Sequence, residues 1–234
     1  MSLLTLIQNA STRIGQPSPS VVVSATDPTT MQLLALANEE GTELMKWGDW
    51  RALRKEKTFT SLAQETQTAM VPTDLGAWID ETFWNRSAHR PIYGPISSQQ
   101  WQAWKAFDAF PVMDVFYFRG ANILMQPVPP AGETFAFEYT SNLWCQSSGG
   151  TGQSAWAADS DTGVLSERLM TLGIIWRYKQ ARGLNYDKDE ETYRLQVSQE
   201  LAQDSPRSTH SFAGGNDWWD RRPGIIVPEG NWDL

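Results

Sequence analysis

The alternation of apolar and polar residues is clearest in the middle of the chain, between residues 110 and 145. There Phe135, Phe137 and Tyr139 fall on one side of an extended backbone, while the residues between them fall on the other. Two apolar runs upstream of them flank Gly120, which suits a tight turn. The pattern predicts a β-meander: a strand, a turn, a second strand, a proline-rich loop and a third strand.

Helical periodicity flanks this region on both sides. Near the amino terminus Leu3, Ile7 and Ala10 recur on one helical stripe. A second helix is predicted to begin after Asp27, an N-cap residue that precedes a proline, and Asp161 is the predicted N-cap of a third. In all, we predict four main helices, at about 3–14, 28–47, 161–183 and 187–206, and a short helix over the sheet at 98–107.

These elements predict a mixed α+β fold. Pairing the two amino-terminal helices with the two carboxy-terminal ones makes a bundle of about four helices, because none of them buries its apolar stripe alone. We therefore expect a ring-forming helical bundle domain from residues 1–56 and 155–204, an inserted β-rich domain over 57–154, and an extended C-terminal tail over 205–234. The segment 147–154, rich in serine and glycine, is expected to be a flexible loop.

The tail combines a loop-like composition with large apolar side chains. From residue 205 onward Ser, Gly, Pro, Asn and Asp are frequent, with no helical or strand period. Burying one tryptophan removes roughly 150–250 Å² of surface from water. A partner that covers these side chains would therefore bind with a large favourable hydrophobic contribution. The alternative is that they fold back onto the chain's own core. The residues predicted to dock onto a partner are Phe212, Trp218, Trp219, Ile225, Ile226, Val227 and Trp232.

Composition and charge narrow the classes of function. The 234 residues carry a net charge of −8 and have a pI near 4.8. This argues against a general nucleic-acid binder, because phosphate contacts need clustered Lys and Arg. Cys145 is the single cysteine, which excludes an internal disulfide. Because no apolar run reaches the roughly 18–20 residues of a membrane span, we expect a soluble protein made in a reducing compartment, without membrane contact.

Candidate catalytic and ligand-binding groups are sparse. The glycine cluster at 149–152 lacks the Lys-Ser/Thr that follows in a phosphate-binding loop, and we expect it to be a flexible loop. His89 and His210 are the two histidines, and neither has Cys, Asp or Glu at zinc-ligand spacing. Cys145, next to Trp144, is expected to be a buried thiol and not a nucleophile paired with His89.

Paired carboxylates are the other candidates for chemistry. Asp80 and Glu81, or the acidic group at 187–191, supply in principle the acid and base of a glycosidase. With 27 acidic residues, however, chance neighbours are common, and acids at the start of a helix complement its dipole. We therefore predict that the chain is not an enzyme and has no catalytic, cofactor-binding or metal-binding residues.

Several short motifs occur in order along roughly residues 1–204. They are Trp50-x-x-Leu53 before a strand at 57–60, Val71-Pro72-x-Asp74, the run Pro-x-x-x-x-Phe-Tyr-Phe-x-Gly-x-x-Ile-Leu-x-x-Pro-x-Pro at 111–129, and Gly-Leu-Asn-Tyr-Asp at 183–187, between two helices. In these motifs, and in the order of two helices, β insertion, two helices and aromatic tail, the chain resembles the head-to-tail adaptor proteins of tailed bacteriophages, most closely those of short-tailed phages.

The resemblance implies a homo-oligomeric ring, commonly of twelve copies, below the portal protein of the capsid. Such a ring connects the portal to the tail or nozzle protein and continues the channel for double-stranded DNA, which passes without specific binding. Its place would be the head–tail junction of the virion, and the host cytoplasm during assembly. Family members often dock a carboxy-terminal extension onto the portal. An acidic lumen suits this role, because it lets DNA slide without sticking.

Two other classes of function are left open. One is a virion-associated cell-wall-degrading enzyme that uses two acids across a cleft. The other is a tail-completion or carbohydrate-binding module, in which Trp78, Trp84, Trp101 and Trp104 form a platform that stacks on sugars. Helical spacing of the last two favours a place in the core instead.

Overall fold

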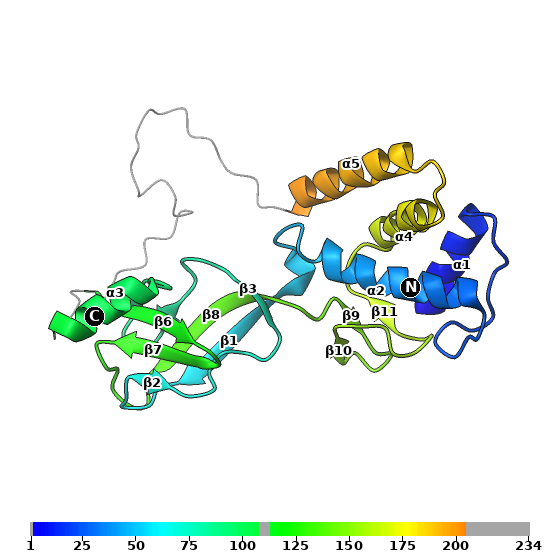
Figure 1. The fold of residues 1–234 in the computed structure, drawn as a ribbon. Coiled ribbons are helices and arrows are strands. Elements are labelled where there is room, and N and C mark those ends of the chain that lie inside the picture. Colours follow the sequence, from blue (N-terminus) through cyan, green and yellow to red (C-terminus); the bar gives the residue numbers. More distant parts are fainter. Residues whose placement is uncertain (1, 108–112, 205–234) are drawn as a thin grey trace. The chain divides into compact units, whose positions relative to one another are not determined.

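The computed structural model describes residues 2–107 and 113–204, which form a mixed α+β fold with antiparallel sheets (Figure 1). This part of the chain divides into two compact units. The helical unit comprises residues 2–54 and 140–204, and the β unit comprises the described residues between 55 and 139. No helix of the described segments is long and apolar enough to cross a membrane.

The helical unit contains four α-helices. They are α1 (Leu3–Arg13), α2 (Pro28–Leu44), α4 (Glu167–Ala181) and α5 (Asp187–Asp204), and a short 3-10 turn, η1 (Arg51–Leu53), follows α2. The second helix begins at its predicted cap, where the side chain of Asp27 accepts a hydrogen bond from the Thr30 N–H. At the start of the first helix the side chain of Ser2 accepts one from the Thr5 N–H. Each cap satisfies a backbone donor that has no partner inside its helix.

Helix α4 is the centre of the helical unit, because it packs against α1, α2 and α5. Its Leu169, Ile174 and Tyr178 are buried in a core to which all four helices contribute. Trp144 and Trp156, from the segment that leads into α4, fill the same core and meet edge to face at 5.4 Å between ring centroids. An edge-to-face pair places the positive ring edge on the negative face of its neighbour.

A small three-stranded sheet belongs to the helical unit. In it β9 (Cys145–Gln146) lies between β10 (Gly152–Gln153) and β11 (Thr162–Gly163). The sequence predicts a flexible loop at 147–154, but this segment contains the paired strand β10. It also predicts an inserted domain that extends to residue 154, but residues 140–154 belong to the helical unit, because the compact units divide between 139 and 140. The burial of Trp144 and Cys145 in the helical core explains this placement.

The prediction that Asp161 caps the third main helix is wrong. Helix α4 begins later, at Glu167, and Ser166 occupies its N-cap position, where its hydroxyl donates to Glu200 at 3.1 Å and does not cap a backbone N–H of the helix. The carboxylate of Asp161 is buried and accepts the N–H groups of Ala157 and Ala158, both at 2.8 Å. It therefore stabilises the preceding turn and not the helix.

The β unit consists of two sheets and one helix. The larger sheet has the order β1 (Arg54–Thr60), β8 (Thr134–Ser141), β4 (Trp84–Asn85), β5 (Arg90–Pro91), and β3 (Leu75–Trp78) also pairs with β8. The smaller sheet has the order β2 (Thr66–Gln67), β7 (Asn122–Gln126), β6 (Val115–Arg119). Helix α3 (Ser98–Phe107) lies against the smaller sheet, where Trp101 stacks on Tyr117 at 5.6 Å between ring centroids.

Aromatic side chains from both sheets form the core of the β unit. Phe59, Phe135 and Phe137 of the larger sheet pack in one cluster with Phe116 of the smaller sheet and with Phe83. Phe59 and Phe135 stack at 5.5 Å between centroids, and Phe83 meets Phe116 edge to face at 4.9 Å. The period-two pattern around Phe135 is thus confirmed as a strand with an aromatic inner face.

The predicted meander is only half correct. Strands β6 and β7 pair as the expected hairpin, but β8 joins the other sheet instead of pairing with β7. Strand β7 already has β6 on one side and β2 on the other, so neither of its edges is free for β8. The inner face of β8 is buried along its whole length, and the strand lies between β1 and β4 in its sheet.

Candidate functional site

The β unit carries a groove of about 650 Å³ on one face of its larger sheet. Side chains alternate along β8, so Ala136 and Glu138 lie on the face opposite the aromatic core. The groove forms over these two residues, and Trp84 of the neighbouring strand lines it. Trp84 and Ala136 are direct partners across the β4–β8 ladder. Because alanine is small, its side chain leaves space beside the indole ring.

Two loops form the rim of the groove. Glu81 and His89 both line it, and both have a left-handed backbone, with φ of 62° and 53°. Non-glycine residues rarely adopt this conformation. Neighbouring side chains hold both loops: Thr82 Oγ1 donates to the Ile79 carbonyl at 2.7 Å, and the buried Asn85 accepts the N–H of Ala88 at 2.9 Å. The rim is therefore fixed by internal hydrogen bonds.

The groove is acidic. Glu56, Glu81 and Glu138 line it together with one guanidinium, that of Arg86, which gives a net charge of −2 with His89 neutral. Arg86 forms an ion pair with Glu56. The carboxylates of Glu81 and Glu138 are exposed and have no hydrogen-bond or ion-pair partner among the described residues. Two negative charges thus remain uncompensated next to the half-buried indole of Trp84.

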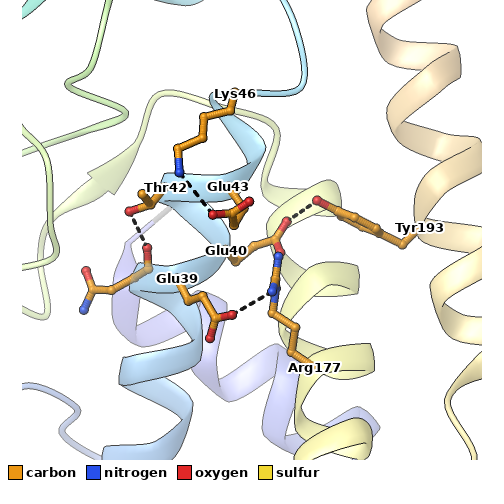
Figure 2. A network of polar contacts seen from close by, with 8 residues as sticks. Glu39, Glu40, Thr42, Glu43, Lys46, Arg177 and Tyr193 are labelled. Atoms are coloured by element: carbon orange, nitrogen blue, oxygen red, sulfur yellow. Dashed lines mark hydrogen bonds and ion pairs between the residues drawn. The ribbon is translucent and has the colours of Figure 1, made fainter. Parts of the chain in front are cut away.

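The helical unit contains a buried polar cluster that joins three of its helices (Figure 2). Glu40 of α2 is fully buried. Its Oε2 accepts Nε of Arg177 from α4 at 2.9 Å, and its Oε1 accepts the hydroxyl of Tyr193 from α5 at 2.6 Å. Arg177 also donates to Oε1 of Glu39 at 2.9 Å. Both oxygens of the buried carboxylate are therefore satisfied.

Burial has the largest effect on the pKa values of Glu40 and Tyr193 in this cluster. It raises the pKa of Glu40 above the ordinary value of 4.5, against the hydrogen bonds from Tyr193 and Arg177, which lower it. Burial also raises the pKa of Tyr193, and the neighbouring negative charge of Glu40 raises it further. The cluster connects helices and restricts their register, which is a structural role.

The residues predicted to dock onto a partner, Phe212, Trp218, Trp219, Ile225, Ile226, Val227 and Trp232, lie outside the described residues, and so does His210. Of the other candidates, His89 lies on the groove rim. Cys145 is fully buried in the helical unit, and burial together with the charge of Asp161 raises its pKa to about 12. This thiol is not a nucleophile at neutral pH, because the thiolate is the reactive form.

The four tryptophans proposed as a sugar platform have different environments. Trp101 of α3 is 2% exposed, because it packs on the smaller sheet, and Trp78 packs against Phe116 and Phe137 at 5.0 and 4.6 Å between centroids. Trp104 is half-buried on α3. Within the groove, Trp84 is the tryptophan that lines the surface. A platform of all four is therefore not formed.

The acidic residues considered as a catalytic pair lie in different parts of the structure. Glu81 lines the groove, while the group at 187–191 begins α5. In that group Asp189 pairs with Lys179 at 2.5 Å, and Glu190 pairs with Arg194 at 2.6 Å. Over residues 2–107 and 113–204, no three His, Cys, Asp or Glu side chains converge as metal ligands would.

The glycine cluster forms part of a turn between β9 and β10. The N–H of Ser147 donates to the Thr151 carbonyl at 2.8 Å, and Gly150 has a φ of 84°. No phosphate-binding strand–loop–helix unit occurs at this turn.

Comparisons with protein-family models and with curated proteins find no match for this chain. Sequence reasoning missed the groove. Alternation along β8 placed Ala136 and Glu138 on the outer face, but the pairing of Ala136 with Trp84 depends on a neighbour about fifty residues earlier, which no local pattern reveals.

Proposed function

We propose that this chain is a structural head-to-tail adaptor of a tailed bacteriophage, which forms a ring below the portal, connects the capsid to the tail and continues the DNA channel. One observation supports the proposal: in the chain, residues 55–139 of the β unit lie between the two segments, 2–54 and 140–204, that form the helical unit. This is the element order in which the sequence resembles the adaptors. In the finer architecture we propose, the helices form a bundle with an inserted β domain.

The helical unit suits the body of a ring subunit. A subunit that repeats around a closed ring makes the same contact with each neighbour, so its contact faces must keep their shape. The buried cluster of Glu40, Arg177 and Tyr193 ties α2, α4 and α5 together, and Trp144 and Trp156 fill the core beside them. These contacts favour a rigid body in the helical unit.

The charge and the tail support the remaining parts of the proposal. A net charge of −8 reduces non-specific attraction to DNA, as a channel for DNA requires. The apolar side chains between Phe212 and Trp232 would dock onto the portal, and a tail or nozzle protein would bind the opposite end of the ring. Docking would then bury these aromatic side chains against the portal.

The experiment is assembly with portal rings from a phage whose genome encodes this chain. Native mass spectrometry and electron microscopy of the mixture should detect a ring, with twelve copies expected. A variant that ends at residue 205 should unfold at the same temperature as the full chain but fail to bind the portal. A chain that stays monomeric with the portal, at concentrations where portal rings are intact, would contradict the adaptor proposal. Capture of the shortened variant would contradict the role of the tail alone.

A further inference from the structure

We propose that the groove of the β unit binds a basic peptide segment of another protein, with a lysine or arginine side chain on the carboxylates of Glu81 and Glu138 and against the ring of Trp84. The partner is thus defined by its chemistry, as an exposed segment with positive charge. This binding site lies entirely within the β unit, so it needs neither a ring nor a portal.

Charge complementarity carries the choice of partner. The guanidinium of Arg86 is already paired with Glu56, whereas Glu81 and Glu138 have no partner in the described part of the chain. A cation that enters the groove therefore finds two unpaired carboxylates and does not have to displace an existing ion pair. An anion would meet a net charge of −2. The groove thus selects positive charge.

The apolar part of the groove favours lysine or arginine over a small cation. The half-buried ring of Trp84 supplies apolar surface beside the carboxylates, and the small side chain of Ala136 lies next to it. Lys and Arg lay their methylene stems on apolar surface while the charged group reaches polar partners. Their cationic groups also interact favourably with the face of an indole ring. A volume of about 650 Å³ is larger than one side chain needs, and it leaves space for the peptide that carries it.

The groove is formed before binding. Asn85 is 2% exposed and accepts the N–H groups of Ser87 and Ala88, while its amide donates to Glu133 at 2.7 Å. On the other rim, Thr82 accepts the N–H of Glu138 at 3.2 Å. Loops held in this way lose little conformational freedom when a ligand binds.

The test is a titration of the full, ¹⁵N-labelled chain, followed by NMR through the indole N–H signal of Trp84, which is assigned by its loss in Trp84→Phe. The probe is a nine-residue peptide with blocked ends that alternates glycine with lysine and arginine. We expect a saturable shift of this signal. Affinity should fall about tenfold in the double variant Glu81→Gln/Glu138→Gln and should decrease with added salt.

Two further variants separate the groove from general surface charge. Asp187→Asn/Glu191→Gln removes the same number of charges from α5, in the other unit, and should leave the affinity unchanged. Ala136→Leu keeps every charge and fills the space beside Trp84, and it should abolish binding while the unfolding transition remains cooperative. An equal loss of affinity in the α5 variant would overturn the proposal, because it would show non-specific attraction.

Other occupants of the groove are distinguished by the same signal. A tetramer of N-acetylglucosamine that shifts the Trp84 signal when the basic peptide does not would reassign the groove to neutral sugars. A peptide with the sequence of residues 215–228, which includes Arg221 and Arg222, would reassign it to the chain's own tail if it bound at least tenfold more tightly than the probe. Absence of any shift with all three ligands would also overturn the proposal.

Discussion

Gly173 of α4 lies directly against the carboxylate of Glu40 of α2, so closely that a Cβ atom at position 173 would overlap it. This contact explains a glycine in the middle of a helix, where alanine is favoured by about 1 kcal/mol. The close approach of the two helices lets Arg177 and Tyr193 reach the same carboxylate. The glycine is therefore required for packing and not for a turn.

Replacing this glycine should destabilise the helical unit. The added methyl group in Gly173→Ala must displace the buried side chain of Glu40, and overpacking of this kind outweighs the gain in helix propensity. We expect a net loss of about 2 kcal/mol in the free energy of unfolding, measured with urea. The matched control is Gly149→Ala, whose Cβ would meet nothing closer than 3.8 Å. A variant at 173 as stable as this control would contradict the packing argument.

The hydroxyl of Tyr193 should contribute measurably to stability. Tyr193→Phe removes the donor that lies 2.6 Å from Oε1 of Glu40 and leaves that buried oxygen without a partner. The expected cost is about 1–3 kcal/mol in urea unfolding. Tyr117→Phe is the control, because the Tyr117 hydroxyl contacts Ser98 at an exposed site, where water replaces the lost bond. Equal effects of the two changes would show that the cluster is not buried.

The raised pKa of Glu40 predicts a particular dependence of stability on pH. A folded-state pKa above the unfolded value of about 4.5 means that the fold prefers the protonated carboxyl. Its favourable contribution is complete below the unfolded pKa and is lost as the pH rises through the higher folded pKa. Relative to Glu40→Gln, which mimics the neutral form, the unmodified chain should lose stability as the pH rises from 4 to 8.

Urea unfolding of both proteins across this pH range measures the difference, and the variant's own profile removes the contribution of all other titrating groups. If the unmodified chain instead gained stability over the variant with rising pH, the ion pair with Arg177 would outweigh burial. The pKa of Glu40 would then be lowered in the folded state.

The thiol of Cys145 should be unreactive in the folded protein. It is fully buried, and its Sγ donates to the Gln153 carbonyl at 3.3 Å. With its pKa raised to about 12, thiolate is scarce at pH 8. Labelling by a thiol reagent should therefore follow the unfolding transition in urea. In Cys145→Ser/Ser148→Cys, the thiol lies at an exposed position and should react within the dead time of mixing; fast labelling of the natural cysteine would be the contrary result.

Local patterns were sufficient for the helices and for one hairpin. The cap at Asp27 and the hairpin of β6 and β7 depend on residues within a few positions of one another, so the sequence alone predicts them. The expected cap at Asp161 failed for a tertiary reason. A carboxylate accepts from whichever donors the fold brings to it, and here these are the N–H groups of Ala157 and Ala158 in the preceding turn.

The sequence by itself determined the mixed α+β class, the limits of most helices, and a strand with aromatic side chains on one face around Phe137. Only the tertiary structure decided that this strand, β8, pairs in the larger sheet and not with β7, the strand before it in the sequence. It also decided that Ala136 pairs with Trp84 beside the groove, and that the carboxylate of Glu40 accepts hydrogen bonds from Arg177 and Tyr193. The physical reason is the range of the interactions. Periodicity and capping act within a few residues, whereas strand pairing and burial depend on partners that only the folded chain brings together.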